Sequence, residues 1–487
     1  MRQGGTDGRG RRRPATPAHL RAHRGRHQAE RRGADVSALR FERSAERALA
    51  AAVDGGARDA ELYFHHGAEL TVRVFAGEVE SLTAAEARGA GLRVFVDSRM
   101  GFAYTSDLTE DGVRQLVAGA LDACRYTEPD EHVGLSDLAP DGEIPGLAAA
   151  DFDAMPVDAR VAMALELDAA VGRQHADVRR AAGTVYGDER GRTELHTTRG
   201  VRAGFDATAA YAFTEAIAAR GDEMQSGHSF TYGRSASSLD IGACAAEAAE
   251  RAAALLGAER APSRTTTVLF EPWAAASLIG TLGSSLSAEA VQKGRSLLAG
   301  RLGEAVAASC VTLVDDGRLL EGMASGPWDG EGVPTQRTEV IAGGVLRSYL
   351  HNTYTARRDG RAVSTGNAAR TSYRSTPELA PTNMFLVPGD RSHRELIVAM
   401  GDGVLVSDVH GLHTVNPVTG EFSVGINGHL ICAGERGTPI REMTVAGTLL
   451  ELLARIEGLG SDLRFMFAAG FVGAPSVLVR ELAVSGG

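Results

Sequence analysis

Lysine is almost absent from this chain: Lys293 is the only lysine among 487 residues, and arginine supplies nearly all of the positive charge. Arginine and lysine differ too much in geometry and hydration for one functional need to explain this replacement, so we interpret it as a coding bias. Aromatic residues are also scarce, at 5%, and alanine and 59 glycines take their place. The hydrophobic fraction of 44% still predicts a globular protein of two or three domains with a large core.

Cysteine is rare as well, and its spacing excludes two kinds of site. The four cysteines lie far apart and form no CxxC pair, which argues against a zinc ribbon and against a disulfide framework. We expect them to be small buried residues in a reducing compartment (Cys124, Cys244, Cys310 and Cys432). No apolar run reaches ~18 residues, the length of a membrane-spanning helix. These absences predict a cytoplasmic protein without a membrane span.

The net charge of −11 is divided unevenly along the chain. Residues 1–33 contain ten arginines against Asp7 and Glu30, a balance of +8 that leaves −19 for the rest. An acidic body argues against a general nucleic-acid surface. We interpret residues 1–36 as a disordered basic extension, or as an over-extended translation start before Val36, because such segments seldom fold. A targeting signal or a basic nucleic-acid-binding arm is the alternative.

Several catalytic motifs are missing. The sequence contains no Walker A or GxGxxG pattern, so nucleotide binding has no support, and no GxSxG stands between a strand and a helix. None of the fourteen histidines is followed by glutamate, so HExxH and its longer-spaced relatives are absent. A zinc peptidase helix of that kind needs both its histidines and the glutamate that takes a proton from the metal-bound water.

Hydrophobic periodicity predicts an α+β fold. In the first half, a helix over 41–53 precedes an antiparallel meander whose short strands we expect to be separated by Gly67, Gly77, Gly89 and Gly91. The core-facing residues of the meander are predicted to be Val72, Val74, Leu92, Val94 and Val96. Further predictions are helices over 108–126, 156–175 and 240–256, strands over 178–232, and a linker over 130–153. Thr109 and Asp240 are the expected N-caps.

The second half is predicted to be a strand-rich domain with antiparallel sheets and a few helices. It should open with a strand over 265–270, followed by a helix from Pro272 to about Ser287. Short strands fill 299–424, and the last elements are a helix over 444–456 and a strand over 476–482. We therefore expect an N-terminal domain over 37–260 and a C-terminal domain over 261–487.

The stretch Ser407–Ile431 is the first candidate site, because three histidines fall in a polar loop that leads into two strands. His410 and His413 are three residues apart, so a curled loop could bring both to one metal ion with Asp408 as a third ligand. The alternative is that both rings hydrogen-bond the loop. Two histidines without an orienting carboxylate pattern are a weak signal, so we expect no metal site in this chain.

Residues 364–389, STGNAARTSYRSTPELAPTNMFLVPG, resemble the signature of the TldD/PmbA family. Residues 314–357 and 416–435 support the resemblance, and GLRVFVDSRMGFAYTSDL at 91–108 fits it as well. The resemblance spans Phe41 to the C-terminus and leaves residues 1–36 outside. It implies a two-subunit peptidase that cleaves unfolded or modified peptides in a closed interior. One subunit, TldD-like, holds zinc through HExxxH and a late cysteine, and the other, PmbA or TldE, does not.

This chain departs from the zinc-binding pattern of the family. The matching stretch is VLFEPWAAASLIG at 268–280, where Phe270 and Ala275 stand at the two histidine positions and Glu271 keeps the glutamate. The late region, FAAGFVGAPSVLV at 467–479, has no cysteine. The resemblance therefore implies the PmbA/TldE-type subunit, without zinc of its own and paired as a heterodimer with a TldD-like catalytic partner that carries zinc.

The expected function is that of a non-catalytic subunit that lines the peptide tunnel and completes the partner's site. The candidates for the tunnel wall or the subunit interface are the polar signature residues Asn367, Arg370, Tyr373, His410, His413 and Asn416. The alternative for these residues is loop scaffolding, in which they shape turns and cap carbonyl groups. Two other functions stay open: a stand-alone metal-dependent peptidase that uses His410 and His413, and a homodimeric peptide-binding module.

Overall fold

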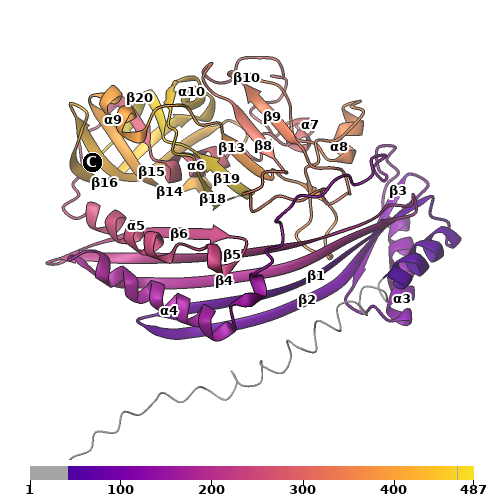
Figure 1. Ribbon diagram of the computed structural model, residues 1–487. Coiled ribbons are helices and arrows are strands. Elements are labelled where there is room, and N and C mark those ends of the chain that lie inside the picture. Colours follow the sequence, from indigo (N-terminus) through magenta and orange to yellow (C-terminus); the bar gives the residue numbers. More distant parts are fainter. Residues whose placement is uncertain (1–41, 469, 487) are drawn as a thin grey trace, which may run out of the picture.

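A computed structural model describes residues 42–468 and 470–486, so the predicted basic extension of residues 1–36 lies outside the described part. One long antiparallel sheet organises the first half, with strand order β3-β2-β1-β4-β5-β6. Helices cover one face of this sheet, and the C-terminal elements lie over the other face (Figure 1). Its strands are β1 Asp59–Phe75, β2 Glu78–Val96, β3 Arg99–Thr105, β4 Val178–Thr197, β5 Arg202–Arg220 and β6 Glu223–Gly233.

The strands of this sheet are much longer than predicted, because three of the four glycines expected at turns lie inside strands. Only Gly77 makes a turn, with φ of 80°. Gly67 lies in β1, and Gly89 and Gly91 lie in β2, each paired in register with neighbouring strands. A Cβ atom on Gly89 or Gly91 would collide with Tyr373 of the C-terminal half. Two of these glycines therefore make room for another part of the chain rather than for a turn.

Alternation along the strands separates the two faces of the sheet. The predicted core residues Val72, Val74, Leu92 and Val94 are buried on the helix-covered face, and Val96 packs against the cluster that contains Leu92 and Val94. The helix over 42–54 and α3, Glu110–Ala123, cover one end of this face. The other end lies under α4, Val157–Gln174, and α5, Ile241–Ala254.

The helix starts of the first half follow the local capping rules. The Thr109 hydroxyl accepts a hydrogen bond from the Gly112 amide at 3.2 Å, and the Asp240 carboxylate accepts one from the Ala243 amide at 2.9 Å. Both predicted N-caps are therefore confirmed. The 130–153 segment contains turns and extended backbone but no helix or strand before the short turn Phe152–Ala154.

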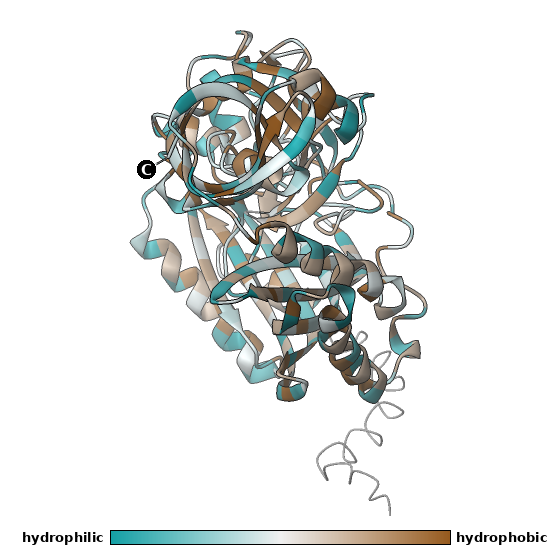
Figure 2. Cartoon of the chain, turned by 90° about the vertical axis from the view of Figure 1, so that its left-hand side faces the viewer, coloured by the Kyte–Doolittle hydropathy of each residue, from teal (hydrophilic) through white to brown (hydrophobic). Residues whose placement is uncertain are grey.

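The C-terminal half builds two six-stranded sheets. In the first, β7, β14, β15, β16 and β20 form a closed ring, because β16 pairs with β20 as well as with β15. Figure 2 shows this ring nearly end-on. Its strands are β7 Arg264–Phe270, β14 Gly403–His410, β15 Glu421–Cys432, β16 Glu435–Thr448 and β20 Val477–Ser485, with β17 Ile456–Leu459 beside β20.

The second sheet has the strand order β10-β9-β8-β13-β19-β18. Its strands are β8 Leu313–Asp316, β9 Arg337–Ala342, β10 Val345–Leu346, β13 Asn383–Leu386, β18 Arg464–Ala468 and β19 Gly470–Ala474, and β11 Ala368–Ala369 pairs separately with β12 Glu378–Leu379. The helices are α6 Pro272–Gly280, α7 Ala288–Gln292, α8 Thr353–Arg358, α9 His393–Met400 and α10 Leu449–Ala454. Helix α6 contacts both sheets and is almost entirely buried. The α+β class is confirmed.

Two predicted helices of the second half were wrong in extent. Residues 444–448 belong to strand β16, and only 449–454 are helical, because β-branched Thr444, Val445 and Thr448 fit a strand whose partners β15 and β20 complete the ring. Helix α6 ends at Gly280 instead of Ser287, where Gly280 and Gly283 weaken helical backbone. Within the described residues, no helix is long and apolar enough to cross a membrane.

Candidate functional site

The stretch that matches the zinc motif has the expected strand-to-helix geometry. Strand β7 ends at Phe270, Glu271 is the N-cap of α6, and Pro272 is the first helical residue. The side chains of Phe270 and Ala275 are 1% and 3% exposed and belong to the main core of the C-terminal half. The backbone frame of the motif is thus present, with apolar packing at both histidine positions.

Glu271 faces two arginines from other elements. Its carboxylate lies 3.9 Å from a guanidinium nitrogen of Arg251 on α5 and 3.5 Å from one of Arg436 on β16. Arg251 also donates a hydrogen bond to the Ser407 carbonyl at 2.7 Å, and its guanidinium lies 5.5 Å from the ring centre of Trp273. Two arginine side chains therefore supply positive charge beside the Glu271 carboxylate, where a zinc-binding motif would have a metal ion.

The residues at this position do not fit a zinc ion. Structural and catalytic zinc sites take three or four nitrogen, sulfur or oxygen ligands, and only Glu271 offers one here. The two neighbouring guanidinium groups would repel a divalent cation. Across residues 42–468 and 470–486, no three His, Cys, Asp or Glu side chains are placed to hold one metal ion.

The histidines of Ser407–Ile431 lie close to this position but do not converge. His410, at the end of β14, has a ring nitrogen 2.9 Å from the Asn427 amide nitrogen and 3.9 Å from the Asp408 carboxylate. Asp408 lies equally far from His228 on β6, whose pKa is lowered by burial, with Asp408 opposing that shift. His429 is buried and contacts the Ala254 carbonyl at 3.0 Å.

His413 and Asn416 lie in the exposed loop between β14 and β15. The Asn416 side chain accepts hydrogen bonds from the amides of Val418 and Thr419 at 2.9 and 3.2 Å, which is an Asx turn. Asn416 therefore shapes the loop. His410 and His413 keep exposed rings, so they are the members of the predicted set that a partner or a peptide could reach.

Asn367, Arg370 and Tyr373 lie in the interior instead. Asn367 is 2% exposed and donates to the Asp315 carboxylate at 2.7 Å, and Tyr373 is 3% exposed. Arg370 donates to the carbonyls of Gly330 and Ser375 at 2.8 and 3.0 Å. All three contact other parts of the same chain, which matches the scaffolding alternative.

Arg370 belongs to a buried group of charges that joins the two halves, which we name the charged contact (Glu61, Arg93, Glu331 and Arg370). Arg93 forms a two-pronged ion pair with Glu61 at 2.8 and 3.0 Å and a second pair with Glu331 at 3.2 Å. Arg370 also pairs with Glu61 and lies 4.6 Å from the ring centre of Tyr63. Burial raises the pKa of Glu61, but Arg93 and Arg370 outweigh it, so the net shift is downward.

No sequence pattern indicated the charged contact except at Arg370. Glu61 and Arg93 stand in strands where an arginine or glutamate is ordinarily a solvent-facing residue. Glu331, the second partner of Arg93, is separated from it by 238 residues. Arg93 stands between the core residues Leu92 and Val94, so its side chain lies on the opposite face of the sheet. That face would ordinarily be exposed to solvent, but here the C-terminal half covers it.

A second set of residues joins the halves at the other end of the sheet, which we name the aromatic contact (Phe230, Tyr232, Trp273, Phe467 and Phe471). The rings of Phe230 and Trp273 lie 4.8 Å apart, edge to face, and those of Tyr232 and Phe471 lie 4.9 Å apart. Trp273 and Phe471 are buried at this contact, whereas Phe467 remains 51% exposed. Trp273 places the contact directly beside Glu271.

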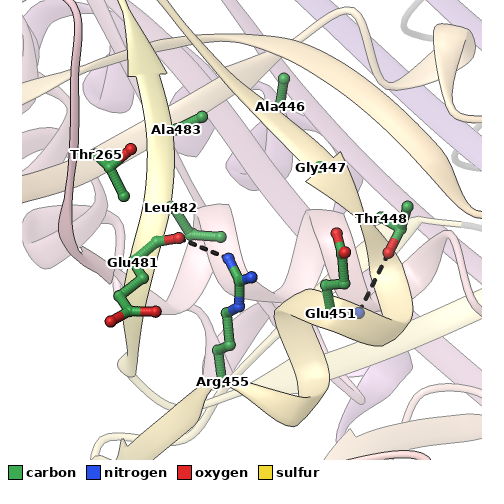
Figure 3. A pocket seen from close by; sticks show the side chains of 9 residues that line it. All are labelled: Thr265, Ala446, Gly447, Thr448, Glu451, Arg455, Glu481, Leu482 and Ala483. Carbon is green, nitrogen blue, oxygen red and sulfur yellow. Dashed lines mark hydrogen bonds between the residues drawn. The ribbon is translucent and has the colours of Figure 1, made fainter.

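A hollow of about 350 Å³ lies where β16 and β20 separate after the pairing of Ala446 with Ala483 and α10 begins. Figure 3 shows the side chains around it, with Arg455 donating to the Glu481 carbonyl at 2.7 Å. The Thr448 hydroxyl caps α10 by accepting from the Glu451 amide. The one cation of this hollow is thus hydrogen-bonded to backbone, and no residue singled out from the sequence lines it.

Comparison with known proteins decides the family. Models described as PmbA/TldA metallopeptidase domain 1, central domain and C-terminal domain match residues 60–124, 150–256 and 263–486. The chain belongs to the PmbA/TldD family. The predicted resemblance is therefore confirmed, and the matched segments contain the charged contact, the aromatic contact and Glu271.

Individual relatives of the PmbA/TldD family match over most of their length. "Metalloprotease PmbA" of Escherichia coli O157:H7 is 27% identical over 423 residues, 86% of this chain and 90% of that protein. A Thermotoga maritima structure, described as a proposed modulator of DNA gyrase, has a TM-score of 0.84 at 28% identity and covers 91% of this chain and 100% of its own. TldE from Thermococcus kodakarensis has a TM-score of 0.84 at 21% identity, covers 91% and 100% of the two chains, and shows the same fold.

Proposed function

We propose that this chain is the non-catalytic subunit of a PmbA/TldD-type metallopeptidase, paired with a TldD-like partner that carries the zinc. The observation that supports the proposal is that the positions of the zinc motif hold other side chains. Phe270 and Ala275 pack into the core, and Glu271 faces Arg251 and Arg436. Such a chain keeps the strand and the helix of the motif, but apolar side chains replace the two histidines, so this motif keeps its backbone structure and loses its zinc ligands. Its role is then to enclose peptide substrate.

Open strand edges support a role in holding peptide. Strands β3, β6 and β18 each lie at the end of a sheet, so one side of each strand has no described strand partner. An extended peptide can add to such an edge through main-chain hydrogen bonds, largely independent of its side chains. That mode suits an enzyme acting on unfolded peptides of varied sequence. The exposed rings of His410 and His413 lie on the same half of the molecule as β18.

Co-expression with a TldD-like partner that has an intact HExxxH motif tests the proposal. We expect one co-eluting species on size exclusion, with zinc in a one-to-one ratio to the partner and peptide cleavage only by the pair. His413→Ala and His410→Ala in this chain should leave the zinc content unchanged. If the partner cleaves equally well alone and elutes separately, the proposal is wrong.

The same preparation separates the alternatives. Stoichiometric zinc in this chain alone, lost in His413→Ala, would establish a stand-alone metal-dependent peptidase. A dimer of this chain that binds peptide and ignores the partner would establish a homodimeric peptide-binding module. The first result would rule out the non-catalytic role, and the second would rule out the heterodimer.

A further inference from the structure

The long sheet has an unpaired edge along the first part of β2. Strand β1 pairs with one side of β2 from Glu78 to Phe95, whereas β3 pairs with the other side only over residues 90–96. Residues 78–89, which we name the open edge, therefore have no strand partner on their outer side among the described residues. Figure 1 shows β2 along the rim of the sheet.

The middle of the open edge is exposed on both faces of the sheet. All residues from Thr83 to Arg88 are exposed, although alternation along the strand points them to opposite faces. Proteins protect such an edge with proline, lysine, a bulge or a covering segment. From Ser81 to Gly89 the open edge contains neither proline nor lysine, and its pairing with β1 is regular. Its backbone groups can therefore pair with a further strand.

The open edge can pair with its own copy in only a few registers. In an antiparallel ladder, two facing residues belong either both to a hydrogen-bonded pair or both to a non-hydrogen-bonded pair. The two-fold axis between two identical strands must therefore pass through a residue and not between two residues. The open edge is bounded by the turn at Ala76–Gly77 on one side and by β3 on the other. Only an axis on Thr83 or Ala84, at its middle, uses nearly all of it.

The charges of the open edge favour the axis on Ala84. This register places Glu80 opposite Arg88 of the second copy, and the symmetry repeats the pair. An axis on Thr83 would place Glu80 opposite Glu86, and like charges in directly opposite positions destabilise a sheet. Glu80 is exposed and stands where the pairing of β2 with β1 shifts, at the end of the regular stretch. Neither Glu80 nor Arg88 forms an ion pair with any residue that the structure describes, so both charges are available to a second strand.

We propose that two copies of this chain pair antiparallel through the open edge, with Ala84 on the two-fold axis. The two six-stranded sheets then form one continuous sheet, with the helices of both copies on one face and both C-terminal halves on the other. The same patch serves both subunits, as a two-fold dimer requires. The inference goes beyond the proposed function and does not depend on it. Glu271 contacts Arg251 of α5, which packs on β6 at the opposite side of the sheet, so this position stays outside the contact.

Sedimentation velocity of the full-length chain tests the inference. The native chain should sediment as a dimer, at twice its mass of 51.0 kDa. Ala84→Lys places two positive charges at the axis and should give a monomer with an unchanged far-UV circular dichroism spectrum. Ala246→Lys, at an exposed site on α5, is the matched control and should remain a dimer. A monomeric native chain, or a dimer that survives in Ala84→Lys, would overturn the inference.

Charge reversal tests the register of the two strands. Arg88→Glu should weaken the dimer about ten-fold at low salt, because each new carboxylate faces Glu80 of the second copy. The double variant Glu80→Arg/Arg88→Glu exchanges the two signs and should restore the native dissociation constant. A double variant that dimerises no better than Arg88→Glu would contradict the register and with it the inference.

Oxidative cross-linking tests which occupant the open edge has. Ala84→Cys should cross-link two copies through a disulfide, because facing side chains at the axis lie within reach of one another. Ala246→Cys should not exceed the background that the exposed Cys310 and Cys432 give in the native chain. The same cross-link should form when a TldD-like partner is bound. If the partner dissociates the dimer and abolishes the cross-link, the partner occupies the open edge and the second copy is excluded.

Discussion

The charged contact and the aromatic contact hold the same two halves together by opposite physical means. The charged contact buries four ionised side chains, an arrangement whose desolvation cost nearly cancels its attraction, so its contribution lies in fixed geometry more than in stability. The aromatic contact packs large rings against one another, and dispersion attraction between them tolerates small shifts better than the fixed hydrogen bonds of the charged contact do. From this comparison we infer that the charged contact fixes the position of the C-terminal half, and that the aromatic contact contributes more of the stabilising free energy between the halves.

Two buried groups near these contacts, Asp329 and His429, respond to pH in opposite directions. Burial and then the Glu331 charge raise the pKa of Asp329, beside the charged contact, to about 7. A carboxyl group with a raised pKa in the folded state favours folding at low pH, and that contribution is lost as pH rises from about 4 to 7. His429 contacts α5 near the aromatic contact, and burial lowers its pKa to about 4. Its contribution is complete above about 6.5 and is lost as pH falls toward 4.

The largest effect is expected from Arg93→Met. The substitution leaves Glu331 without its ion pair and Glu61 with only Arg370, so unfolding free energy should fall by about 3–5 kcal/mol. Urea unfolding followed by far-UV circular dichroism measures it. Adding Glu331→Gln should recover part of the loss, because one unpaired buried charge is removed. A change below about 1 kcal/mol would mean that the charged contact is already neutralised by solvent.

A smaller loss should follow from Phe230→Leu in the aromatic contact. The substitution removes the edge-to-face pair with Trp273 and the stacked pair with Tyr232, which are worth about 1–2 kcal/mol together. Near-UV circular dichroism should lose intensity, since Trp273 is one of only two tryptophans. Tyr126→Leu, at an 83% exposed site, is the matched control and should change stability by less than about 0.5 kcal/mol. An equal loss of unfolding free energy in the two variants would mean that Phe230 contributes no more to stability than an exposed surface ring does.

The smallest effect at neutral pH is expected from His429→Gln. Between pH 6.5 and 4 the unfolded native chain binds a proton at His429 that the folded chain does not bind, so the native chain loses unfolding free energy as pH falls. Glutamine does not titrate, so the variant should lose less unfolding free energy over that range. Urea midpoints at pH 6.5, 5.5 and 4.5 give the two slopes. His413→Gln, in the exposed loop, should follow the native slope. A variant slope identical to the native one would show that His429 is already hydrated in the folded chain.

Local signals predicted the helices of the first half well. Thr109 and Asp240 cap their helices through bonds to residues only three positions away, so sequence alone contains both partners. The same holds for the strand-to-helix frame around Glu271, where Pro272 fixes the first turn. The sequence alone also shows that Phe270 and Ala275 replace the two histidines of the zinc pattern.

Features set by distant partners were not predictable. Gly89 and Gly91 read as turn signals, because the residue that requires them, Tyr373, is almost three hundred positions away. In the helix expected over 444–456, residues 444–448 are strand instead, since β15 and β20 supply their partners and override local preference. The sequence predicts Arg370 at the tunnel wall or the subunit interface, yet its partner Glu61, which is distant in the sequence, holds it in the interior.

The closed ring of the C-terminal half has a consequence for the order in which the chain folds. Strands β1 to β6 and the helices that cover them, up to α5, are complete once residue 254 has been synthesised, so the long sheet and its helices can form while translation continues. The ring cannot close before residues 477–485 are available, because β20 lies between β7 and β16. Until then β7 and β16 expose unpaired edges. Ribosome-bound chains that stop short of β20 should therefore carry a folded first half and depend on chaperones for the second.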